Sequence, residues 1–375
     1  MKTKTKNQHY IPQSILANFA NDKGQVAEAL VQHKKIYSTN YRQSMSERHT
    51  YEHPDIEVNF LENAFGKIES YFAPGMREII SNLESDSVNI EEIKKQVEIY
   101  MKDFLIFYYR SGALLNEFAF DGLNENDKIP LMLEKIMDSN YLTRLSETII
   151  TFYNFAIIKS ESSNFLLGDQ YVSTAALSIK GQYTNISNRH LGLKDVLMLI
   201  PLSSKYYIVY SNGNTPNFIR NNKINILSSD EVCEINKTIM NNSYVKCIGQ
   251  HKIPLEIIIE NFKYQSPSRS IMAFKSGVKT AALGKKEVFF YEDDIEQWNF
   301  FRELKHVINK DTKRNDFCKC GSGKKYKKCC LNKSERNYAI VENMYKKDQH
   351  IKIKAHPDSY IEKALEEYSY YSKED

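Results

Sequence analysis

Four cysteines near the end of the chain have the residue type and spacing best suited to chemistry. They form the pattern C-x-C-x8-C-C and are Cys318, Cys320, Cys329 and Cys330. In a reducing compartment, thiols packed this densely are more often zinc ligands than disulfide partners. Zn²⁺ takes four soft ligands in a tetrahedron, which two close pairs joined by a short loop can supply. Gly321 and Gly323 allow the backbone to turn sharply between the pairs. The pattern therefore predicts a structural zinc site with no open position for catalysis.

The same stretch, from Arg314 to Cys330, resembles the SEC-C motif. This motif is the zinc-binding tail of a bacterial protein translocase and is fused to many otherwise unrelated proteins. The shared residues are Asn315, Asp316, Cys318, the run Cys320–Lys327, Cys329 and Cys330. Phe317 and Lys319 stand where the motif often has proline, and neither is a ligand. The resemblance implies zinc held by the four cysteines. Two roles for the zinc are consistent with the sequence. It could only stabilise the fold of the module, or it could also shape a docking surface.

The cysteine-rich segment is also the basic part of the chain. Residues 301–333 contain eleven Lys and Arg against three acidic residues, whereas the whole chain has a net charge of +4. The remainder is therefore mildly acidic. Such a basic module attracts nucleic acid or an acidic protein surface, although lysine runs are also often only solvated. Tyr326 is the one aromatic residue inside the zinc loop, which gives little support for stacking on nucleic-acid bases.

Composition places the rest of the chain among ordinary globular proteins. The length of the whole chain, 375 residues, suits two or more modules, and its 12% aromatic content favours packed cores over disorder. Residues 1–20 lack the apolar run of a signal peptide, and no stretch reaches the length of a membrane span. We therefore expect a cytoplasmic protein without a membrane partner. The sequence contains no P-loop, dinucleotide-binding fingerprint or G-x-S-x-G motif.

Apolar periodicity predicts helices in the first half of the chain. One face of a helix over residues 55–83 is formed by Leu61, Phe65, Ile68 and Phe72. Pro74 and Gly75 are expected to interrupt this helix. Two more helices are predicted over residues 90–115 and 131–155, the second with a break near Ser139.

Short apolar runs between turn residues predict strands in the second half. These runs are residues 165–167, 196–199, 206–210, 245–248 and 257–259. A helix over residues 229–241 is predicted between them, with Ser228 or Ser229 as its N-cap. The fold class is α+β: a helix-rich N-terminal half, a central mixed or antiparallel sheet, a small C-terminal zinc knuckle and a helical tail. The expected divisions are a body over 1–300, a zinc module over 311–332 and a charged helical tail over 333–375.

The body resembles a second family. The opening N-Q-H-Y-I-P-Q, from Asn7 to Gln13, resembles the signature of the bacterial family DUF4238. Similar segments follow in order: Leu16 and Phe19, Leu61–Glu69 with its two glutamates, Tyr109–Arg110, Gly168–Val172, Ile200–Ser203 and Asn236. The chain has Gly168 and Tyr171 where the family has Ser and Pro. Members of this family occur among single-gene antiphage defence systems, but their biochemistry is not established. The resemblance therefore implies a bacterial protein with a role in antiviral defence, without a mechanism.

Five polar residues that this resemblance singles out are candidates for one catalytic site. They are His9, Gln13, Glu69, Arg110 and Asp169. If His9, Glu69 and Asp169 meet, they could bind Mg²⁺ or Mn²⁺. Arg110 could then stabilise the charge of a phosphoryl group. This arrangement would make the protein a metal-assisted hydrolase, such as a phosphodiesterase or nuclease.

Each of these residues also suits a structural role. His9 can cap a turn, Arg110 can pair with a carboxylate in the core, and Asp169 can cap a loop. Two other functions therefore remain open. One is a non-enzymatic sensor or docking protein that binds a phage component, and the other is a nucleic-acid-binding protein without catalysis. Convergence of the candidate residues in an accessible pocket favours catalysis, whereas pairing away from solvent favours binding.

Overall fold

The protein folds as two compact units. The computed structural model describes residues 5, 7–121, 128–162, 164–179, 191, 192, 194–263, 271–273, 279–281, 286, 288–302, 305–336 and 339. Unit 1 comprises Met1–Ala175 and Leu191–Ser266, and unit 2 comprises Ala176–His190 and Pro267–Asp375. Beyond residue 339, the predicted helical tail over 333–375 lies outside the described residues.

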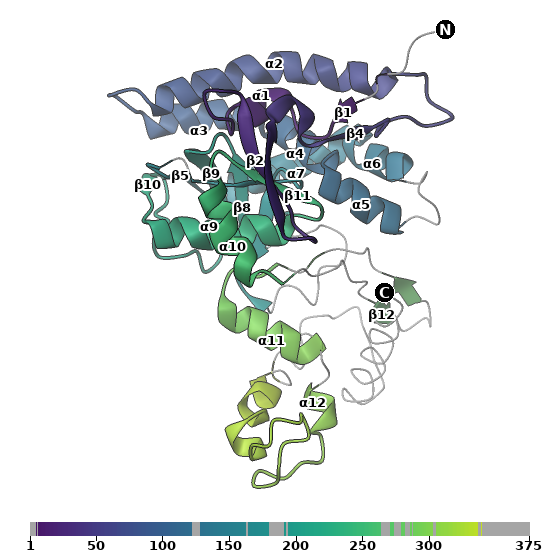
Figure 1. Cartoon of the computed structure of the whole chain (residues 1–375), viewed down its shortest axis with the longest axis vertical. Coiled ribbons are helices and arrows are strands. Elements are labelled where there is room, and N and C mark those ends of the chain that lie inside the picture. The colour runs from purple at the N-terminus through teal and green to yellow at the C-terminus, as the bar shows by residue number, and fades with distance from the viewer. Residues whose placement is uncertain are drawn as a thin grey trace. The chain divides into compact units, whose positions relative to one another are not determined.

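The helices of unit 1 are concentrated in its N-terminal part. They are α1 (Gln13–Ala17), α2 (Phe60–Leu83), α3 (Ile90–Ile99), α4 (Met101–Tyr109), α5 (Gly112–Asp121), α6 (Lys128–Met137), α7 (Ser139–Phe152), α9 (Ser229–Asn242) and α10 (Lys252–Asn261). The long helix α2 lies beside α3 (Figure 1). The two helices are joined by a hydrogen bond that Asn82 donates to Gln96. Among the described helices of the whole chain, none combines the length and apolar character needed to cross a membrane.

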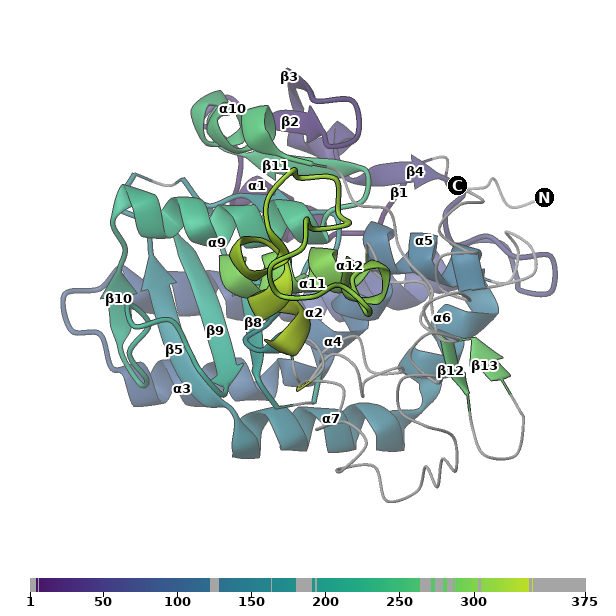
Figure 2. The same ribbon diagram turned by 90° about the horizontal axis from the view of Figure 1, so that it is seen from below.

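Two larger sheets complete unit 1. The five-stranded sheet has the order β10 (Ile224–Ile226), β5 (Asn154–Lys159), β9 (Tyr206–Asn212), β8 (Val196–Pro201) and β7 (Ser173–Ala176). Its β10–β5 pair is parallel, whereas β5–β9 and β9–β8 are antiparallel (Figure 2). The antiparallel four-stranded sheet has the order β3 (Lys35–Asn40), β2 (Gln25–Leu30), β11 (Lys246–Gly249) and β6 (Leu167–Gly168). The α+β class with mixed and antiparallel sheets is therefore confirmed.

Helix α2 continues through Pro74 and Gly75, so the predicted interruption is wrong. Phe72 is fully buried and packs edge-to-face on Phe104 and Phe107, with ring centroids 5.3 and 4.7 Å away. This packing outweighs the hydrogen bond that a proline removes from a helix. Gly75 is needed here because a Cβ atom would lie 2.1 Å from the hydroxyl of Tyr100.

The predicted helix over residues 90–115 is divided into α3, α4 and the start of α5. The first break is at Tyr100, and the second is at Arg110 and Ser111. The second break makes Arg110 the C-cap of α4. By contrast, the predicted break near Ser139 is confirmed, because Asp138 ends α6 and caps α7 by accepting a hydrogen bond from the amide of Tyr141.

The strand predicted over residues 257–259 is wrong, because these residues belong to α10. Leu255, Ile258 and Ile259 are buried, whereas Ile253 and Ile257 are exposed, which is a helical pattern. A run of three isoleucines fits a strand or a helix equally well by composition. The predicted helix over 229–241 is confirmed as α9, and Ser228 and Glu231 form its capping box.

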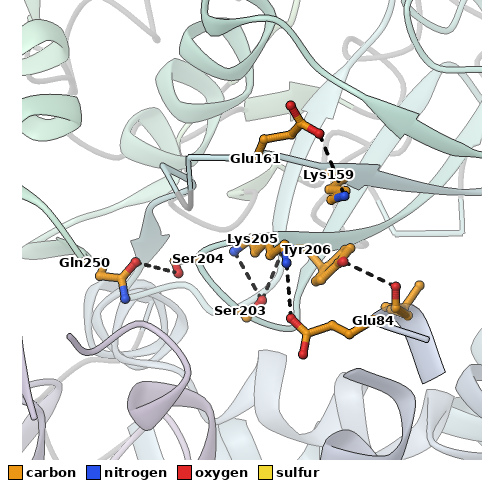
Figure 3. Close-up of polar contacts among 9 residues, drawn as sticks. Glu84, Lys159, Glu161, Ser203, Ser204, Lys205, Tyr206 and Gln250 are labelled. Carbon is orange, nitrogen blue, oxygen red and sulfur yellow. Dashed lines mark hydrogen bonds and ion pairs between the residues drawn. The ribbon is translucent and has the colours of Figure 1, made fainter. Parts of the chain in front are cut away.

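The turn between β8 and β9 connects the five-stranded sheet to the helices (Figure 3). The hydroxyl oxygen of Ser203 accepts hydrogen bonds from the amides of Lys205 and Tyr206. The Lys205 ammonium lies 3.2 Å from the carboxylate of Glu84, directly after α2. Ser204 donates to Gln250, which in turn donates to the carbonyl of Ala20. The turn thus holds the end of α2 and the segment after α1 in fixed positions.

Unit 2 is built around α11 (Glu292–Arg302) and α12 (Lys305–Ile308). Its described elements also include β12 (Ile271–Ala273), β13 (Lys279–Ala281) and the short 3-10 helix η3 (Tyr326–Lys328). One buried cluster is formed by Ala176, Ile179, Phe289 and Trp298. A second contains Phe300 of α11, Cys318, Tyr326 and Cys330. The cysteine-rich module is therefore packed on α11.

Candidate functional site

The four cysteines of unit 2 converge as the sequence predicts. Their Sγ atoms all lie within 4.8 Å of one another. The Sγ atom of Cys329 is 3.5 Å from that of Cys320 and 3.7 Å from that of Cys330. Four thiolates around zinc, with Zn–S bonds of about 2.3 Å, lie about 3.8 Å apart. The donor set therefore fits a tetrahedral structural metal such as zinc.

A short antiparallel pairing shapes this module. Phe317 is bridged to Lys325, and the flanking bonds run from the Cys318 amide to the Lys324 carbonyl and from the Tyr326 amide to the Asp316 carbonyl, each 2.8 Å. Gly321 and Gly323 connect the two sides with φ values of 81° and 68°, a region that favours glycine. The loop thereby brings the two cysteine pairs together.

Two further residues support the cysteines. The side-chain carbonyl of Asn309 accepts a hydrogen bond from the Lys319 amide at 3.0 Å, inside the C-x-C turn. Hydrogen bonding to Ser322 lowers the pKa of Cys320 to about 6, whereas burial raises the pKa of Cys330. Nothing in the cysteine spacing marks Asn309, which follows α12 and is almost fully buried.

Four of the five predicted catalytic residues come together in unit 1, joined by Glu62. We call His9, Gln13, Glu62, Glu69 and Arg110 the His9 cluster. His9 ends β1 (Asn7–His9), which pairs with β4 (Ser46–Arg48). Gln13 begins α1, both glutamates lie on α2, and Arg110 ends α4.

Both ring nitrogens of His9 are engaged. Its Nδ1 lies 3.3 Å from the side-chain amide nitrogen of Gln13, which can only donate, so Nδ1 is the acceptor. Its Nε2 therefore carries the hydrogen and donates to the Arg42 carbonyl at 3.0 Å. Burial lowers the pKa of His9, and the nearby charge of Arg110 acts in the same direction. The imidazole is thus a neutral base whose lone pair faces the exposed side chain of Gln13.

Arg110 lies at the centre of the cluster and is only 1% exposed. Its Nη2 donates to the carboxylate of Glu69 at 2.5 Å and to the backbone carbonyl of His9 at 3.2 Å. Its guanidinium carbon lies 4.5 Å from the ring centroid of Phe65 and 5.0 Å from that of Phe107. Within the described residues, Nε and Nη1 have no hydrogen-bond partner. Aromatic faces therefore provide much of the compensation for this buried charge.

Glu62 and Tyr51 extend the site beyond the predicted residues. Burial raises the pKa of Glu62, and the charges of Glu69 and Glu52 raise it further, while Arg110 opposes them. Tyr51 is buried, and its hydroxyl donates to the backbone carbonyl of Arg110 at 3.1 Å. Glu62 is one of the two glutamates in the Leu61–Glu69 segment of the family resemblance, whereas Tyr51 has no sequence signal.

Asp169 has a different set of partners. Its carboxylate accepts hydrogen bonds from the amides of Tyr244, Val245 and Lys246, at 2.9, 2.7 and 3.0 Å. Both carboxylate oxygens are thereby used to fasten the end of β6 to the turn between α9 and β11. In the described part of the chain, only the four cysteines form a group of three or more His, Cys, Asp or Glu residues that could hold a metal. The Mg²⁺ or Mn²⁺ site expected from His9, Glu69 and Asp169 is therefore not supported.

A cavity of about 420 Å³ lies elsewhere in unit 1, between α9 and α10. Its walls include Ser228, Cys233, Pro254 and Ile257, and none of the His9 cluster lines it. Asn236, which also borders it, bonds the amide of Leu166 and the carbonyl of Asn164. This asparagine therefore has a structural role.

Comparisons with known proteins fall on the same two regions. A family described as "Protein of unknown function (DUF4238)" matches residues 7–252, which contain the whole His9 cluster. The SEC-C motif matches residues 314–332, which contain the four cysteines. No curated protein and no solved structure matches the chain.

Proposed function

We propose that this chain, which belongs to the DUF4238 family and carries a SEC-C motif, is a bacterial antiphage defence protein with the His9 cluster as its effector centre. The supporting observation is that one buried guanidinium, Arg110 at the end of α4, bonds both the backbone carbonyl of His9 in β1 and the carboxylate of Glu69 in α2. A buried cation with two unpartnered nitrogens is costly to maintain for structure alone. The defence role follows from the family resemblance, and the cluster supplies a place for the activity.

The chemistry that suits this cluster is metal-independent hydrolysis of a phosphodiester. Neutral His9 can accept a proton from an attacking water at Nδ1 once the side chain of Gln13 swings away. The new P–O bond forms as the bond to the leaving oxygen breaks, and Glu62, whose pKa is raised by burial, is the proposed acid that gives this oxygen a proton. Because Arg110 is buried, it would act on the phosphoryl oxygens through its fixed positive charge and not through direct contact. Solvent then returns His9 and Glu62 to their starting protonation states.

A phage-protection assay tests this assignment. Cells producing the wild-type chain are compared with cells producing His9→Gln, Glu69→Gln or Glu62→Gln. Glu78→Gln is the matched control, because Glu78 lies on the same helix but is exposed and bonds Gln96. Folded yield and zinc content are measured for every variant. Loss of protection by the three cluster variants, with normal folding, supports an effector centre. Full protection by all three contradicts it.

A second function is favoured by a specific observation, namely that both His9 nitrogens are bonded and Arg110 is nearly inaccessible. These features suit a cluster that shapes a recognition surface for a phage component without chemistry. Incubation of the purified chain with labelled RNA and DNA, with and without EDTA, separates the two functions. EDTA-resistant cleavage that His9→Gln abolishes supports hydrolysis. Intact nucleic acid, together with His9-dependent protection in cells, supports recognition.

The zinc module would have a separate task, that of docking the chain to nucleic acid or to an acidic protein surface. The proposed compartment is the bacterial cytoplasm, where reduced cysteines are available to bind zinc. The module is basic and lies in a different compact unit from the His9 cluster. The two tasks can therefore be tested with separate sets of variants.

A further inference from the structure

The surface of the zinc module is strongly positive, although Asp311 and Asp316 are also exposed on it. Seven basic residues, which we call the basic patch, are exposed on it: Lys313, Arg314, Lys319, Lys324, Lys325, Lys327 and Lys328. Within the described residues, none of their side chains makes an ion pair, although Lys333 and Arg336 outside the patch pair with Glu296 and Asp294. The charge of the patch is therefore available to a partner.

One large aromatic side chain lies within this patch. Phe317 is 73% exposed, whereas Tyr326, the aromatic residue inside the zinc loop, is only 7% exposed. Tyr326 packs with the cysteines in the core of the module. The aromatic residue available at the surface is therefore Phe317.

The backbone pairing explains this exposure. Directly opposed residues of an antiparallel pair project to the same face, and their neighbours project to the other face. Cys318 and Tyr326 face the metal-binding core, so Phe317 and its bridge partner Lys325 face outward together. The amide of Lys327 donates to the carbonyl of Arg314 at 3.0 Å, which brings two further basic residues close together. Phe317 thus lies on a cationic face held by the metal site.

We propose that the zinc module binds single-stranded nucleic acid, with Phe317 stacking on a base and the basic patch contacting the phosphates. An exposed aromatic ring among unpaired lysines provides both interactions that sequence-independent single-strand binding uses. Duplex DNA offers its phosphates but not an open base face, and an acidic protein surface offers charge without a flat ring to stack. This inference rests on the docking role proposed for the module, but it does not depend on the effector role of the His9 cluster.

The test measures fluorescence anisotropy of a labelled 12-nucleotide oligo(dT) or oligo(U) with the full-length, zinc-loaded chain. We expect both single strands to bind more tightly than a 12-base-pair duplex. For about four phosphate contacts, the affinity should fall with salt with a log–log slope of about −3. Phe317→Ala should weaken binding about tenfold, and Phe317→Trp should restore it. Lys325→Ala should reduce the magnitude of the salt slope by about 0.7.

Two variants serve as controls for stability and for unspecific aromatic contacts. Phe317→Pro introduces the residue that the motif often has at this position and removes neither flanking bond of the bridge, since these come from Cys318 and Tyr326. It should retain zinc and lose affinity as Phe317→Ala does. Phe152→Ala removes an equally exposed phenylalanine from unit 1 and should not change binding.

Three results would overturn the inference. The first is unchanged affinity of the Phe317→Ala variant with full zinc content. The second is equal affinity for duplex and single strand, and the third is tight binding of poly-glutamate that does not depend on Phe317. If Phe317→Pro loses zinc, the comparison of Phe317→Ala with Phe317→Trp decides the outcome. The variants that decide this assay lie in unit 2, whereas those of the phage-protection assay lie in unit 1, so the two proposals can fail independently.

Discussion

Arg110 donates a hydrogen bond to the carboxylate of Glu69 at 2.5 Å, although the two residues are 41 positions apart in the sequence. The same guanidinium nitrogen also bonds the backbone carbonyl of His9. One arginine at the end of α4 therefore connects β1 to α2. The relative positions of the proposed base, His9, and of the two glutamates on α2 depend on this connection.

Removal of the guanidinium should strongly destabilise unit 1. Arg110→Ala should lower the free energy of unfolding by about 3–5 kcal/mol, because it breaks a buried ion pair and leaves a void between aromatic rings. Urea denaturation followed by far-UV circular dichroism measures this change. The exposed control Glu78→Gln should alter it by less than about 0.5 kcal/mol. A loss below 1 kcal/mol for Arg110→Ala would show that the cluster does not hold these elements together.

Asp169 should contribute to stability rather than directly to activity. Asp169→Asn replaces one acceptor oxygen by an NH₂ group that faces backbone N–H donors, so we expect a loss of about 2–3 kcal/mol in unfolding free energy. The expected phenotype is reduced folded yield with proportionally reduced protection. A variant of normal stability that fails to protect would instead place Asp169 in the effector centre.

His9 should make stability depend on pH. Burial lowers its pKa in the folded chain below the ordinary value of 6.5. As pH falls through 6.5, the unfolded chain binds a proton on His9 before the folded chain does, so the folded state loses stability until its own pKa is reached. From pH 7.5 to pH 5, the unfolding free energy of the wild type should therefore fall relative to that of His9→Gln. A difference that is constant, or that shifts the other way, would show that His9 is not buried as a neutral base.

Zinc removal should unfold the cysteine module while leaving unit 1 intact. The binding of zinc to four thiolates supplies much of the folding free energy of so small a module. We expect one zinc per chain by atomic emission, and rapid proteolysis within residues 311–332 after chelation. Cys318→Ser should reproduce this sensitivity, whereas substitution of Cys233, which lies in unit 1, should not. Protease resistance unchanged by chelation would contradict a structural metal.

The sequence predicts some parts of this protein well because their signals are local. The spacing of the cysteines and the glycines between them is sufficient to define the metal-binding loop, whose ligands lie within thirteen positions. The N-cap predicted at Ser228 or Ser229 likewise gives the start of α9, where the structure has Ser228 as the cap. His9, Glu69 and Arg110 are far apart in the sequence, so no local pattern predicts that they meet. Only the resemblance to a family singles them out together.

Long-range packing decides the features that the sequence does not predict. Pro74 is tolerated in α2 because Phe72 packs on two rings from α4, which no local pattern shows. Asp169 follows an apolar strand, as many reactive residues do, but the amides that bind it come from residues 244–246. In the sequence, Phe317 is only a departure from the motif at a position that is not a ligand, and the pairing with Lys325 is what reveals that it faces outward.

The most direct test of the effector centre uses Glu62→Gln. The Glu62 side chain makes no hydrogen bond within the described residues, and glutamine has nearly the same shape, so the variant should fold with wild-type stability. Loss of the proposed general acid should reduce phage protection, measured as efficiency of plating, by about 100-fold, while Glu78→Gln retains it. Protection by Glu62→Gln equal to that of the wild type would contradict hydrolysis at the His9 cluster.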